Sequence, residues 1–521
     1  MSGQPRERGL LDVAVIGAGL GGISVAVNLR QRYPHATFAV FEQNHLVGGT
    51  WAKNTYPGLR CDIPSQLYSY SFALNPNWSS TYALQPEILA YINDVVDRHR
   101  LKESIFLQQE CLSARWRDDD STWGVRLLDH VTGEEYTVHC HVLITSVGFL
   151  HIPKGTEDIA NYQAFQGKTF HSSAWDHEAE FEGKNVVVIG NGCSANQFIP
   201  WLLEHGNIKS LTQVIRSAHW IAPKVDKLVG EKKKRVLNLF PFVARAHRWW
   251  LAAKLDLAFS AFRKTKVGGI LRKLLETKIR SYMKRAAPPK YHSLLIPTYP
   301  FGAKRPVLDH GYLNALHDPR VTLIRSEKLQ AVDSHMLATE SGQQIPADIL
   351  ILANGFQTQD LLTPMKIQGR NGAVLPDLWH EDGKWPAAYM GTMVASFPNF
   401  FILTGPNTIP SGHSALIGIE CTVDYILRLL RPLLLPRSNR GCTADRHVGS
   451  IEVRSEAQER FNRRIQRKLD KLVCSSNGAV RNWYVDERTG RNTLIWPGTQ
   501  LEFWVTRCVL PVRWSDFAID I

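Results

Sequence analysis

The clearest pattern along the chain is a short apolar run, then a glycine-rich turn, then a longer amphipathic stretch. Residues 12–16 (DVAVI) read as a buried parallel strand, and three glycines follow them with the spacing G-x-G-x-x-G. Residues 23–32 have helical character, and a second apolar run at residues 37–41 predicts the next strand. Together these segments predict a complete βαβ unit.

The glycines of this unit, Gly17, Gly19 and Gly22, allow the backbone to turn tightly and to approach a pyrophosphate group closely. At the start of the following helix, free N–H groups and the helix dipole favour negative charge. Glu42 stands 20 residues past Gly22, where a carboxylate can accept hydrogen bonds from both ribose hydroxyls. We therefore expect a dinucleotide site in this part of the chain.

A second unit of the same kind begins at residue 185. The apolar strand NVVVI leads into G-x-G-x-x-A spacing that includes Gly190, Gly192 and Ser194, and a helix and a strand over residues 211–215 follow. Arg216 stands 26 residues after Gly190, one residue past the spacing of 25 that separates the ribose acid Glu42 from Gly17 in the first unit. A cation there suits a 2′-phosphate and cannot accept a bond from a 2′-hydroxyl, so the second unit predicts NADP over NAD.

Two dinucleotide units in one chain predict an α/β fold with two Rossmann-like domains, as in flavoprotein reductases, with FAD in the first and NADPH in the second. We place the FAD domain at residues 1–150, the NADPH domain with its linkers at residues 151–345, and the second part of the FAD domain, with a substrate-side C-terminal region, at residues 346–521. The sequence has no metal signature. It also lacks a C-x₂-C or C-x₄-C pair near the first unit, which argues against a disulfide reductase.

Charge is concentrated in one segment. The 521 residues carry a net charge of +13, and residues 231–290 alone hold 17 Lys and Arg against 3 Asp and Glu, so the rest of the chain is close to neutral. Within this basic insert, Leu251, Leu255, Phe259 and Phe262 form one stripe of a helix. We interpret the insert as a helical subdomain that caps the substrate cavity, with a membrane-surface helix as the alternative.

The N-terminal segment and the cysteines indicate in which kind of compartment the protein is expected. The N-terminal segment MSGQPRERGL is polar, and the first apolar run is too short for a signal-peptide core or a membrane span. Eight cysteines occur without any C-x-x-C spacing, which suits a reducing compartment. We expect a soluble, cytoplasmic protein without a membrane span. Because no RNA-recognition or zinc-finger signature is present, nucleic acid is not expected as a partner.

Three further segments lie outside the glycine turns. Residues 48–62 (GGTWAKNTYPGLRCD) fit the pattern G-G-x-W-x-x-x-x-Y-P-G-x-x-x-D, and residues 165–176 (FQGKTFHSSAWD) fit F-x-G-x-x-x-H-x-x-x-W-[P/D]. The third is Lys304–Arg305 in YPFGAKRPVLD. Together they resemble the type I Baeyer–Villiger monooxygenases of the class B flavin monooxygenases. Supporting stretches are GFLHIP (148–153), DILILANG (348–355) and TGPNTIPSGH (404–413), so the resemblance runs from about residue 12 to residue 430.

The resemblance implies a reaction. In that family NADPH reduces FAD, dioxygen adds at flavin C4a, and the resulting peroxide attacks a ketone to give an ester or a lactone. Arg305 matches the family's catalytic arginine, which stabilises the negative oxygens. Asp62 matches the aspartate that positions that arginine through a charge-assisted hydrogen bond.

The resemblance also implies cofactor contacts. Lys304, Arg216 and Ser217 match the positions that hold the 2′-phosphate, and Trp51 is placed against the flavin or in the core. His171 is expected to be structural, and Cys61 and Cys193 are interpreted as packing residues. The full set of expected cofactor-binding residues is Gly17, Gly19, Gly22, Glu42, Gly49, Thr50, Trp51, Asp62, Gly190, Gly192, Ser194, Arg216, Ser217, Lys304 and Asn354.

The substrate is less constrained. Residues 490–504 resemble the terminal stretch of the branch that acts on larger or aryl ketones, and on that basis Trp496 is expected to face the substrate. We expect a bulky ketone of specialised metabolism, with O₂ as co-substrate. Two alternatives stay open: a related flavin monooxygenase that oxidises nitrogen or sulfur, and a non-catalytic nucleotide-binding or membrane-surface protein. The sequence leaves the oligomeric state undetermined.

Overall fold

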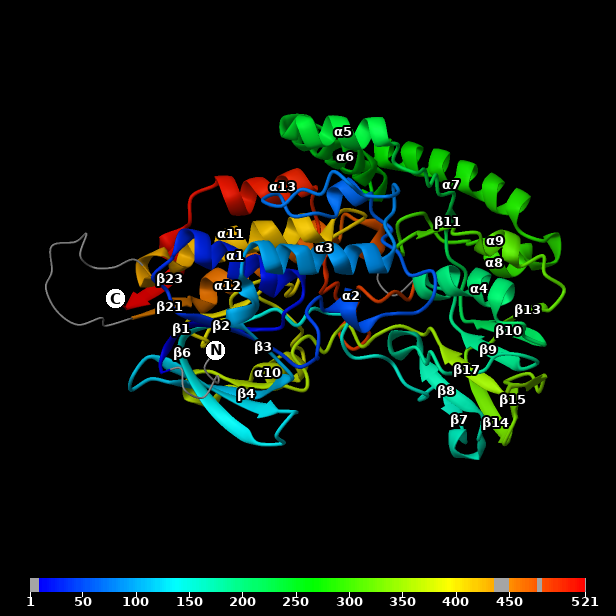
Figure 1. The fold of residues 1–521 in the computed structure, drawn as a ribbon, viewed down its shortest axis with the longest axis horizontal. Coiled ribbons are helices and arrows are strands. Elements are labelled where there is room, and N and C mark those ends of the chain that lie inside the picture. The colour runs from blue at the N-terminus through cyan, green and yellow to red at the C-terminus, as the bar shows by residue number, and fades with distance from the viewer. Residues whose placement is uncertain (1–8, 435–448, 476–479, 521) are drawn as a thin grey trace, which may run out of the picture.

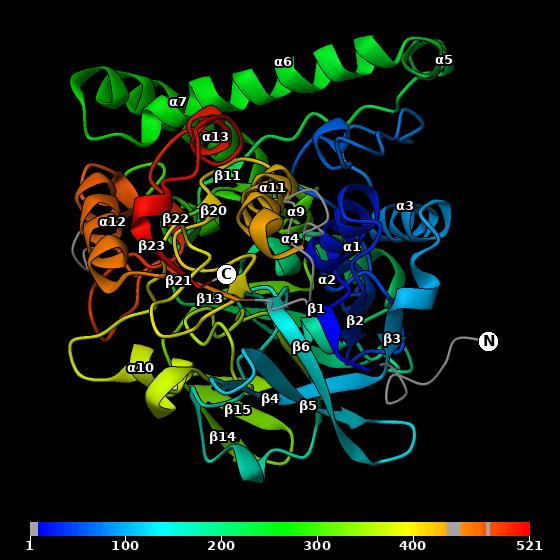
Figure 2. The ribbon, with the colours of Figure 1, turned by 90° about the vertical axis from the view of Figure 1, so that its left-hand side faces the viewer.

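The structure is a computed structural model that describes residues 9–434, 449–475 and 480–520. Two β-sheets form the two halves of the molecule, the first at the left and the second at the right of Figure 1. Helices cover both sheets, and a layer of three helices lies along one edge of the molecule (Figures 1 and 2). The expected α/β fold is confirmed.

The first sheet is built on the first βαβ unit. Strand β1 (Leu11–Ile16) pairs in parallel with β2 (Phe38–Glu42) and with β6 (Glu135–Thr145). In the described part of the chain this sheet has eight strands: β1, β2 and β6 together with β3 (Ile105–Leu107), β4 (Gln109–Arg117), β5 (Thr122–Asp129), β18 (Lys366–Gln368) and β19 (Phe400–Ile402). Because β19 pairs in parallel with β6, segments far apart in the chain share this sheet.

The helix after β1 begins earlier than its sequence pattern predicts. Helix α1 spans Leu20–Arg32, whereas helical character was expected from residue 23. The first turn contains Gly21 and Gly22, and a Cβ on Gly22 would collide with the carbonyl oxygen of Gly17. Glycine therefore serves close helix–strand packing here, although its low helix propensity hides the start of the helix.

The second sheet consists, in the described residues, of five parallel strands in the order β13-β10-β9-β17-β8. Their bounds are β8 (Lys168–His171), β9 (Asn185–Ile189), β10 (Ser210–Ile215), β13 (Val321–Arg325) and β17 (Ile349–Leu352). Helix α4 (Cys193–His205) follows β9. The sheet takes in β17, which lies beyond the expected boundary at residue 345. A smaller sheet packs beside it and consists of β7 (Ile159–Ala160), β14 (Leu329–Asp333), β15 (Met336–Thr339) and β16 (Gln344–Pro346).

The basic insert forms three helices, α5 (Glu231–Leu239), α6 (Pro241–Phe259) and α7 (Lys266–Ala286). Along the top of Figures 1 and 2, α6 lies over α11 (Ala415–Leu434) and α13 (Gln500–Trp504), and α7 lies over the second half of the molecule beside β11 (Ile221–Ala222). The predicted stripe faces inward: Phe259 and Phe262 are buried, and Leu251 and Leu255 are partly buried against the core.

Polar contacts hold the insert in this place. Buried Arg248 donates to Glu420 at 2.9 Å, and Asp256 accepts the backbone N–H groups of Gln500 (2.7 Å) and Leu501 (3.0 Å). The insert is thus anchored at its centre to the helices below. None of the helices in the described ranges has the length and apolarity that crossing a bilayer requires.

Candidate active site

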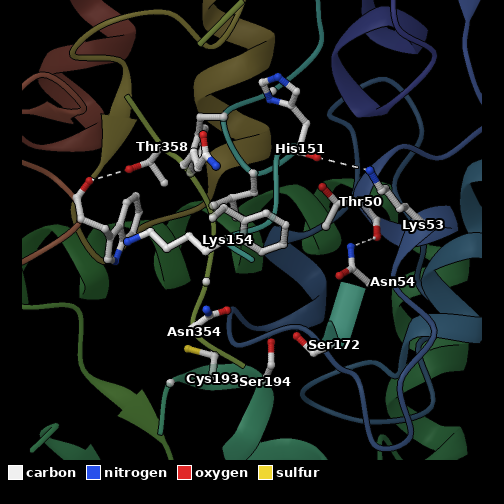
Figure 3. A pocket seen from close by; sticks show the side chains of 18 of the residues that line it. Thr50, Lys53, Asn54, His151, Lys154, Ser172, Cys193, Ser194, Asn354 and Thr358 are labelled. Carbon is white, nitrogen blue, oxygen red and sulfur yellow. Dashed lines mark hydrogen bonds between the residues drawn. The ribbon is translucent and has the colours of Figure 1, made fainter. Parts of the chain in front are cut away.

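A cleft of about 1060 Å³ lies between the two sheets. The carboxyl ends of β1 and β2 contribute Gly17 and Glu42 to its wall, and the ends of β9 and β10 contribute Gly190 and Arg216. Figure 3 shows side chains of both halves around this space, with Thr50 and Lys53 on one side and Ser194 and Asn354 on another. Ligands of open parallel sheets bind at such edges, so the cleft is the candidate site.

The first glycine turn forms a cradle. Gly17 has φ 101°, a conformation that favours glycine, and a Cβ there would lie 2.7 Å from the carbonyl oxygen of Ser146. Gly19 and Gly49 face each other so closely that a Cβ on Gly49 would lie 2.9 Å from the Cα of Gly19. Gly19 caps α1 without a side-chain hydrogen bond, and the first turn of α1 has no acidic residue. The uncapped N–H groups suit a pyrophosphate.

Glu42 and Trp51 complete this end of the cleft. Glu42 is buried; its Oε2 accepts the N–H of Ala18 at 2.7 Å, and its Oε1 accepts the N–H of Asn44 at 2.9 Å. These bonds fix the carboxylate at the end of β2, as a ribose site requires. Trp51 lines the cleft, is largely buried, and donates from Nε1 to the hydroxyl of Tyr68 at 2.9 Å.

The second glycine turn forms a matching cradle. Gly190 has φ 111°, and a Cβ there would collide with the carbonyl oxygen of Ala353. A Cβ on Gly192 would meet nothing within 4 Å, and Gly192 caps α4 without a side-chain bond. Asn354 donates to the carbonyl of Gly155 at 2.8 Å, while its buried Oδ1 has no partner among the described residues. This turn therefore presents free space, N–H groups and a spare acceptor to a ligand.

Cations gather beside the second turn. Lys304 Nζ donates to Ser217 Oγ at 2.6 Å, and burial together with the nearby Arg216 lowers the pKa of Lys304 to about 8. Burial, Arg216 and Arg481 also lower the pKa of Lys154. Lysines whose pKa is lowered by neighbouring positive charges are stabilised in their protonated form by a bound anion, so this cluster fits a phosphate group.

Arg305 and Asp62 meet in the wall of the cleft. Arg305 donates from Nη2 to Asp62 Oδ2, and the two side chains are 35% and 23% exposed. The carboxylate of Asp62 raises the pKa of Arg305 above its ordinary value. The guanidinium is therefore charged at physiological pH, and it lines the same cleft as the two glycine turns.

Cys61, Cys193 and His171 do not offer a nucleophile or base. Burial raises the pKa of Cys61 well above its usual value and that of Cys193 to about 11, so both thiols stay protonated. Buried His171 contacts Ser173 Oγ at 2.7 Å and the carbonyl of Gly355 at 3.1 Å, and burial lowers its pKa. His171 thus ties β8 to the segment after β17.

Most of the residues singled out in the sequence line this one cleft. Two do not. Gly22 packs behind the first turn, and Trp496 is buried against Phe503 (ring centroids 5.2 Å apart) with the guanidinium of Arg507 at 5.1 Å from its ring. None of residues 231–290, all of which the structure describes, lines the cleft. The insert therefore does not cap this cleft, and packs instead over α11 and α13 through α6 and beside β11 through α7.

Sequence reasoning missed several lining residues. Lys154, Arg481 and Trp483 lie in loops, and Trp483 stacks on Phe149 with centroids 5.8 Å apart. Lys53 donates to the backbone carbonyl of His151 at 3.2 Å, as Figure 3 shows. A loop lysine or arginine has no periodicity to mark it, although Lys154 directly follows the stretch GFLHIP. Among the described residues no group of three or more His, Cys, Asp or Glu side chains could hold a metal ion.

Comparisons with known proteins agree with this geometry. The model of the NAD(P)-binding Rossmann-like domain matches residues 15–83, and that of L-lysine 6-monooxygenase/L-ornithine 5-monooxygenase matches residues 87–280. Among solved structures, OTEMO in complex with FAD and NADP is 25% identical with a TM-score of 0.81, and covers 99% of this chain and 100% of its own. Cyclohexanone monooxygenase from Rhodococcus sp. Phi1, bound to NADP⁺, shares the fold at 24% identity and a TM-score of 0.82, covering 99% and 100%.

Curated relatives are similar over nearly the whole length. A Baeyer–Villiger monooxygenase of Pseudomonas aeruginosa is 35% identical over 94% of this chain and 88% of its own length. A Baeyer–Villiger monooxygenase of Streptomyces coelicolor is 33% identical over 94% and 89%. Similarity of this extent, with both glycine cradles and the Arg305–Asp62 pair in one cleft, shows that the chain belongs to the Baeyer–Villiger monooxygenase family.

Proposed function

We propose that the protein is an FAD- and NADPH-dependent monooxygenase that inserts one oxygen atom of O₂ beside a ketone carbonyl and so gives an ester or a lactone. The observation that carries the proposal is the Arg305–Asp62 pair, which places a permanent positive charge in the wall of the cleft that both phosphate cradles also line. The family names of the relatives and the FAD and NADP of the OTEMO complex support it.

The residues of each cradle fit the cofactor proposed for it. Gly17, Gly19 and Glu42, with Gly49 opposite, would hold the pyrophosphate and ribose of FAD. Gly190, Gly192, Ser194 and Asn354 would hold the pyrophosphate half of NADPH, and Lys304, Arg216 and Ser217 its 2′-phosphate. When bound, the nicotinamide supplies hydride to the flavin, and the reduced flavin supplies the activation of O₂.

The chain's own contribution to oxygen transfer is electrostatic. Negative charge develops on oxygen while a ketone is attacked, and Arg305 is a fixed donor that stabilises it within a partly enclosed cleft. Arginine suits the task because it cannot lose its proton. Asp62 holds the guanidinium by a charge-assisted hydrogen bond and thereby limits its orientation. Asp62 is thus a positioning residue, and Arg305 is the catalytic one.

The substrate proposal is limited to the ketone class. A bulky ketone of specialised metabolism was expected from the insert and from Trp496, and neither of them lines the cleft. Beyond residue 480, the residues that line the cleft are 481–483 and 485–488, including Trp483. A cytoplasmic location stays a prediction from the cysteine content.

A second candidate, oxidation of nitrogen, is favoured by the match of residues 87–280 to the lysine and ornithine monooxygenases. The two reactions differ in whether they need the positive charge of Arg305. A neutral amine attacks without creating an oxyanion on carbon, so the Arg305–Asp62 pair favours the ketone reaction.

The test is product analysis under ¹⁸O₂. The purified protein is incubated with NADPH and separate panels of ketones, amines and sulfides, and products are identified by mass spectrometry. We expect one ¹⁸O atom in an ester or lactone from at least one ketone, and no such product from Arg305→Ala. Hydroxylamines or sulfoxides alone, with no ester from any ketone, would overturn the proposal.

A further inference from the structure

The helices of the insert carry a second apolar side that faces away from the protein. On α6, Phe242, Trp249, Trp250 and Leu257 are 51–74% exposed, while Ala252 and Phe259 on the opposite side are buried. Trp249 lies at the edge of the exposed side, where its ring also contacts Trp504 (centroids 5.8 Å apart). At 100° per residue, the four exposed side chains fall within a sector of about 100°. Helix α6 is therefore apolar both toward the core and toward solvent.

Helix α7 repeats this arrangement. Val267, Ile270, Leu271 and Leu274 have the spacing i, i+3, i+4, i+7 that marks the buried face of a helix, yet they are 36–65% exposed. Helix α5 and the residue after it add exposed Leu239 and Phe240. Figures 1 and 2 both place the three helices along one edge of the molecule, and we call their exposed residues the insert surface.

The insert surface is also strongly cationic. Residues 231–290 contain three carboxylates, and two of them point toward the protein. Asp256 accepts the backbone N–H groups of Gln500 and Leu501, and Glu276 accepts that of Phe301. By contrast, exposed lysines and arginines that form no ion pair within the described residues border the apolar stripes: Lys232, Arg235, Lys266, Lys273 and Lys278. Of the 17 Lys and Arg in this segment, 13 are exposed, whereas Arg248 is buried and paired with Glu420, so most of the positive charge faces solvent.

We propose that the insert surface binds the surface of an anionic lipid bilayer, with α6 and α7 lying in the plane of the headgroups. Exposed aromatic and aliphatic side chains bordered by lysine and arginine are the pattern of an interfacial helix. Tryptophans such as Trp249 and Trp250 suit the boundary between headgroups and acyl chains. Since no described helix could span a bilayer, the association is peripheral.

The positive charge and the apolar stripes of the insert surface together favour an anionic bilayer over a second copy of the chain or a nucleic acid. A second copy of the chain would bring the same strongly cationic surface against itself, so like charges would oppose a dimer through this face. A nucleic acid would satisfy the lysines and leave the apolar stripes against a hydrated phosphate backbone. An anionic bilayer satisfies both features at once. Because no insert residue lines the cleft, this proposal goes beyond the proposed function and does not depend on it.

The test is flotation of the full-length protein with vesicles of phosphatidylcholine alone or of phosphatidylcholine containing one third phosphatidylglycerol. Three variants are compared with the wild type. The charge variant changes Lys232, Arg235, Lys266 and Lys273 to Gln, and the apolar variant changes Trp250, Leu257, Ile270 and Leu274 to Gln. The matched control changes four exposed lysines elsewhere to Gln: Lys184, Lys209, Lys328 and Lys366.

We expect the wild type and the control to float with the anionic vesicles and far less with the neutral ones. Each basic residue near such a surface changes binding about fivefold, so the charge variant should bind at least about tenfold more weakly. The apolar variant should lose binding to a similar extent. NADPH oxidation and far-UV circular dichroism should be unchanged in all variants, which separates loss of binding from misfolding.

Three results would overturn the proposal. The first is wild-type protein that does not distinguish anionic from neutral vesicles. The second is a charge or apolar variant that floats as well as the control. The third is a dimer, detected by light scattering, that the apolar variant converts to a monomer while vesicles remain unbound, since this would assign the surface to a second copy of the chain.

Discussion

The charge of Lys304 should decide how well NADPH binds, and its unusual pKa makes this measurable. Lys304 Nζ lies 2.6 Å from Ser217 Oγ beside Arg216, at the place proposed for the 2′-phosphate. A hydrogen bond to a charged group contributes about 2 kcal/mol, equivalent to about a 30-fold change in affinity. Lys304→Gln should therefore raise KM for NADPH by about 30-fold and leave KM for NADH unchanged, since NADH has no 2′-phosphate.

The pH dependence has a definite direction. Burial and Arg216 lower the pKa of Lys304 to about 8, and a bound phosphate favours the protonated amine. Affinity for NADPH should be constant below pH 8 and fall as the pH rises through 8, because binding must then also protonate Lys304. One pH unit above the pKa, the free protein has about a tenth of this amine charged, so KM for NADPH should rise by up to about tenfold.

Steady-state NADPH and NADH oxidation from pH 6.5 to 9.5 measures both effects. Lys304→Arg is the matched control: it should keep most of the affinity and lose the rise near pH 8, because a guanidinium does not titrate there. An equal rise of KM for NADH and NADPH in Lys304→Gln, or a wild-type KM for NADPH that is flat to pH 9.5, would refute the assignment of Lys304 to the 2′-phosphate.

Two further predictions test the second cradle and the anchoring of the insert. Arg216→Asp should abolish the preference for NADPH over NADH, because a carboxylate repels a 2′-phosphate and accepts a bond from a 2′-hydroxyl; an unchanged ratio of the two kcat/KM values would show that another residue distinguishes the 2′-phosphate from the 2′-hydroxyl. Arg248→Ala removes the cation that lies 2.9 Å from the largely shielded Glu420 and leaves Ser71 as the hydrogen-bond partner of this carboxylate. The free energy of unfolding should therefore fall by up to about 3 kcal/mol, measured by urea denaturation and compared with exposed Arg245→Ala. Equal stability of the two variants would contradict this role for the ion pair.

The two glycine cradles could be predicted from the sequence because their chemistry is local. In each unit, strand, turn and helix follow within about 30 residues, and the spacing of Gly17 to Gly22 or of Gly190 to Ala195 encodes a backbone that only this fold uses. The Arg305–Asp62 pair joins positions 243 apart in the chain. It could be expected only because each residue lies inside a motif of a resembling family.

Sequence patterns do not predict what packs against an apolar face, as the insert helices and Trp496 show. The stripe of Leu251, Leu255 and Phe259 faces inward, whereas Val267 and Leu274, with equally regular helical spacing, face solvent. Periodicity marks an apolar face without stating what covers it. For the same reason Trp496 could be placed near the substrate from its neighbours in sequence, although packing against Phe503 and Arg507 removes it from the cleft.

The central claim is that Arg305 stabilises negative oxygen during transfer to a ketone. Arg305→Ala should still bind FAD and be reduced by NADPH, since neither step needs the positive charge of Arg305. Oxygen transfer should fall by about 10²–10³ or more, the usual effect of losing one such donor, and the NADPH consumed should appear as hydrogen peroxide. Asp62→Ala, which keeps the guanidinium charge and loses its orientation, is the milder comparison.

One measurement tests this most directly: the ratio of ester formed to NADPH consumed, with hydrogen peroxide quantified in the same samples, for wild type, Arg305→Ala and Asp62→Ala. The account predicts a high ratio for wild type, an intermediate one for Asp62→Ala, and almost no ester with one peroxide per NADPH for Arg305→Ala. Ester formation by Arg305→Ala at the wild-type rate would contradict it.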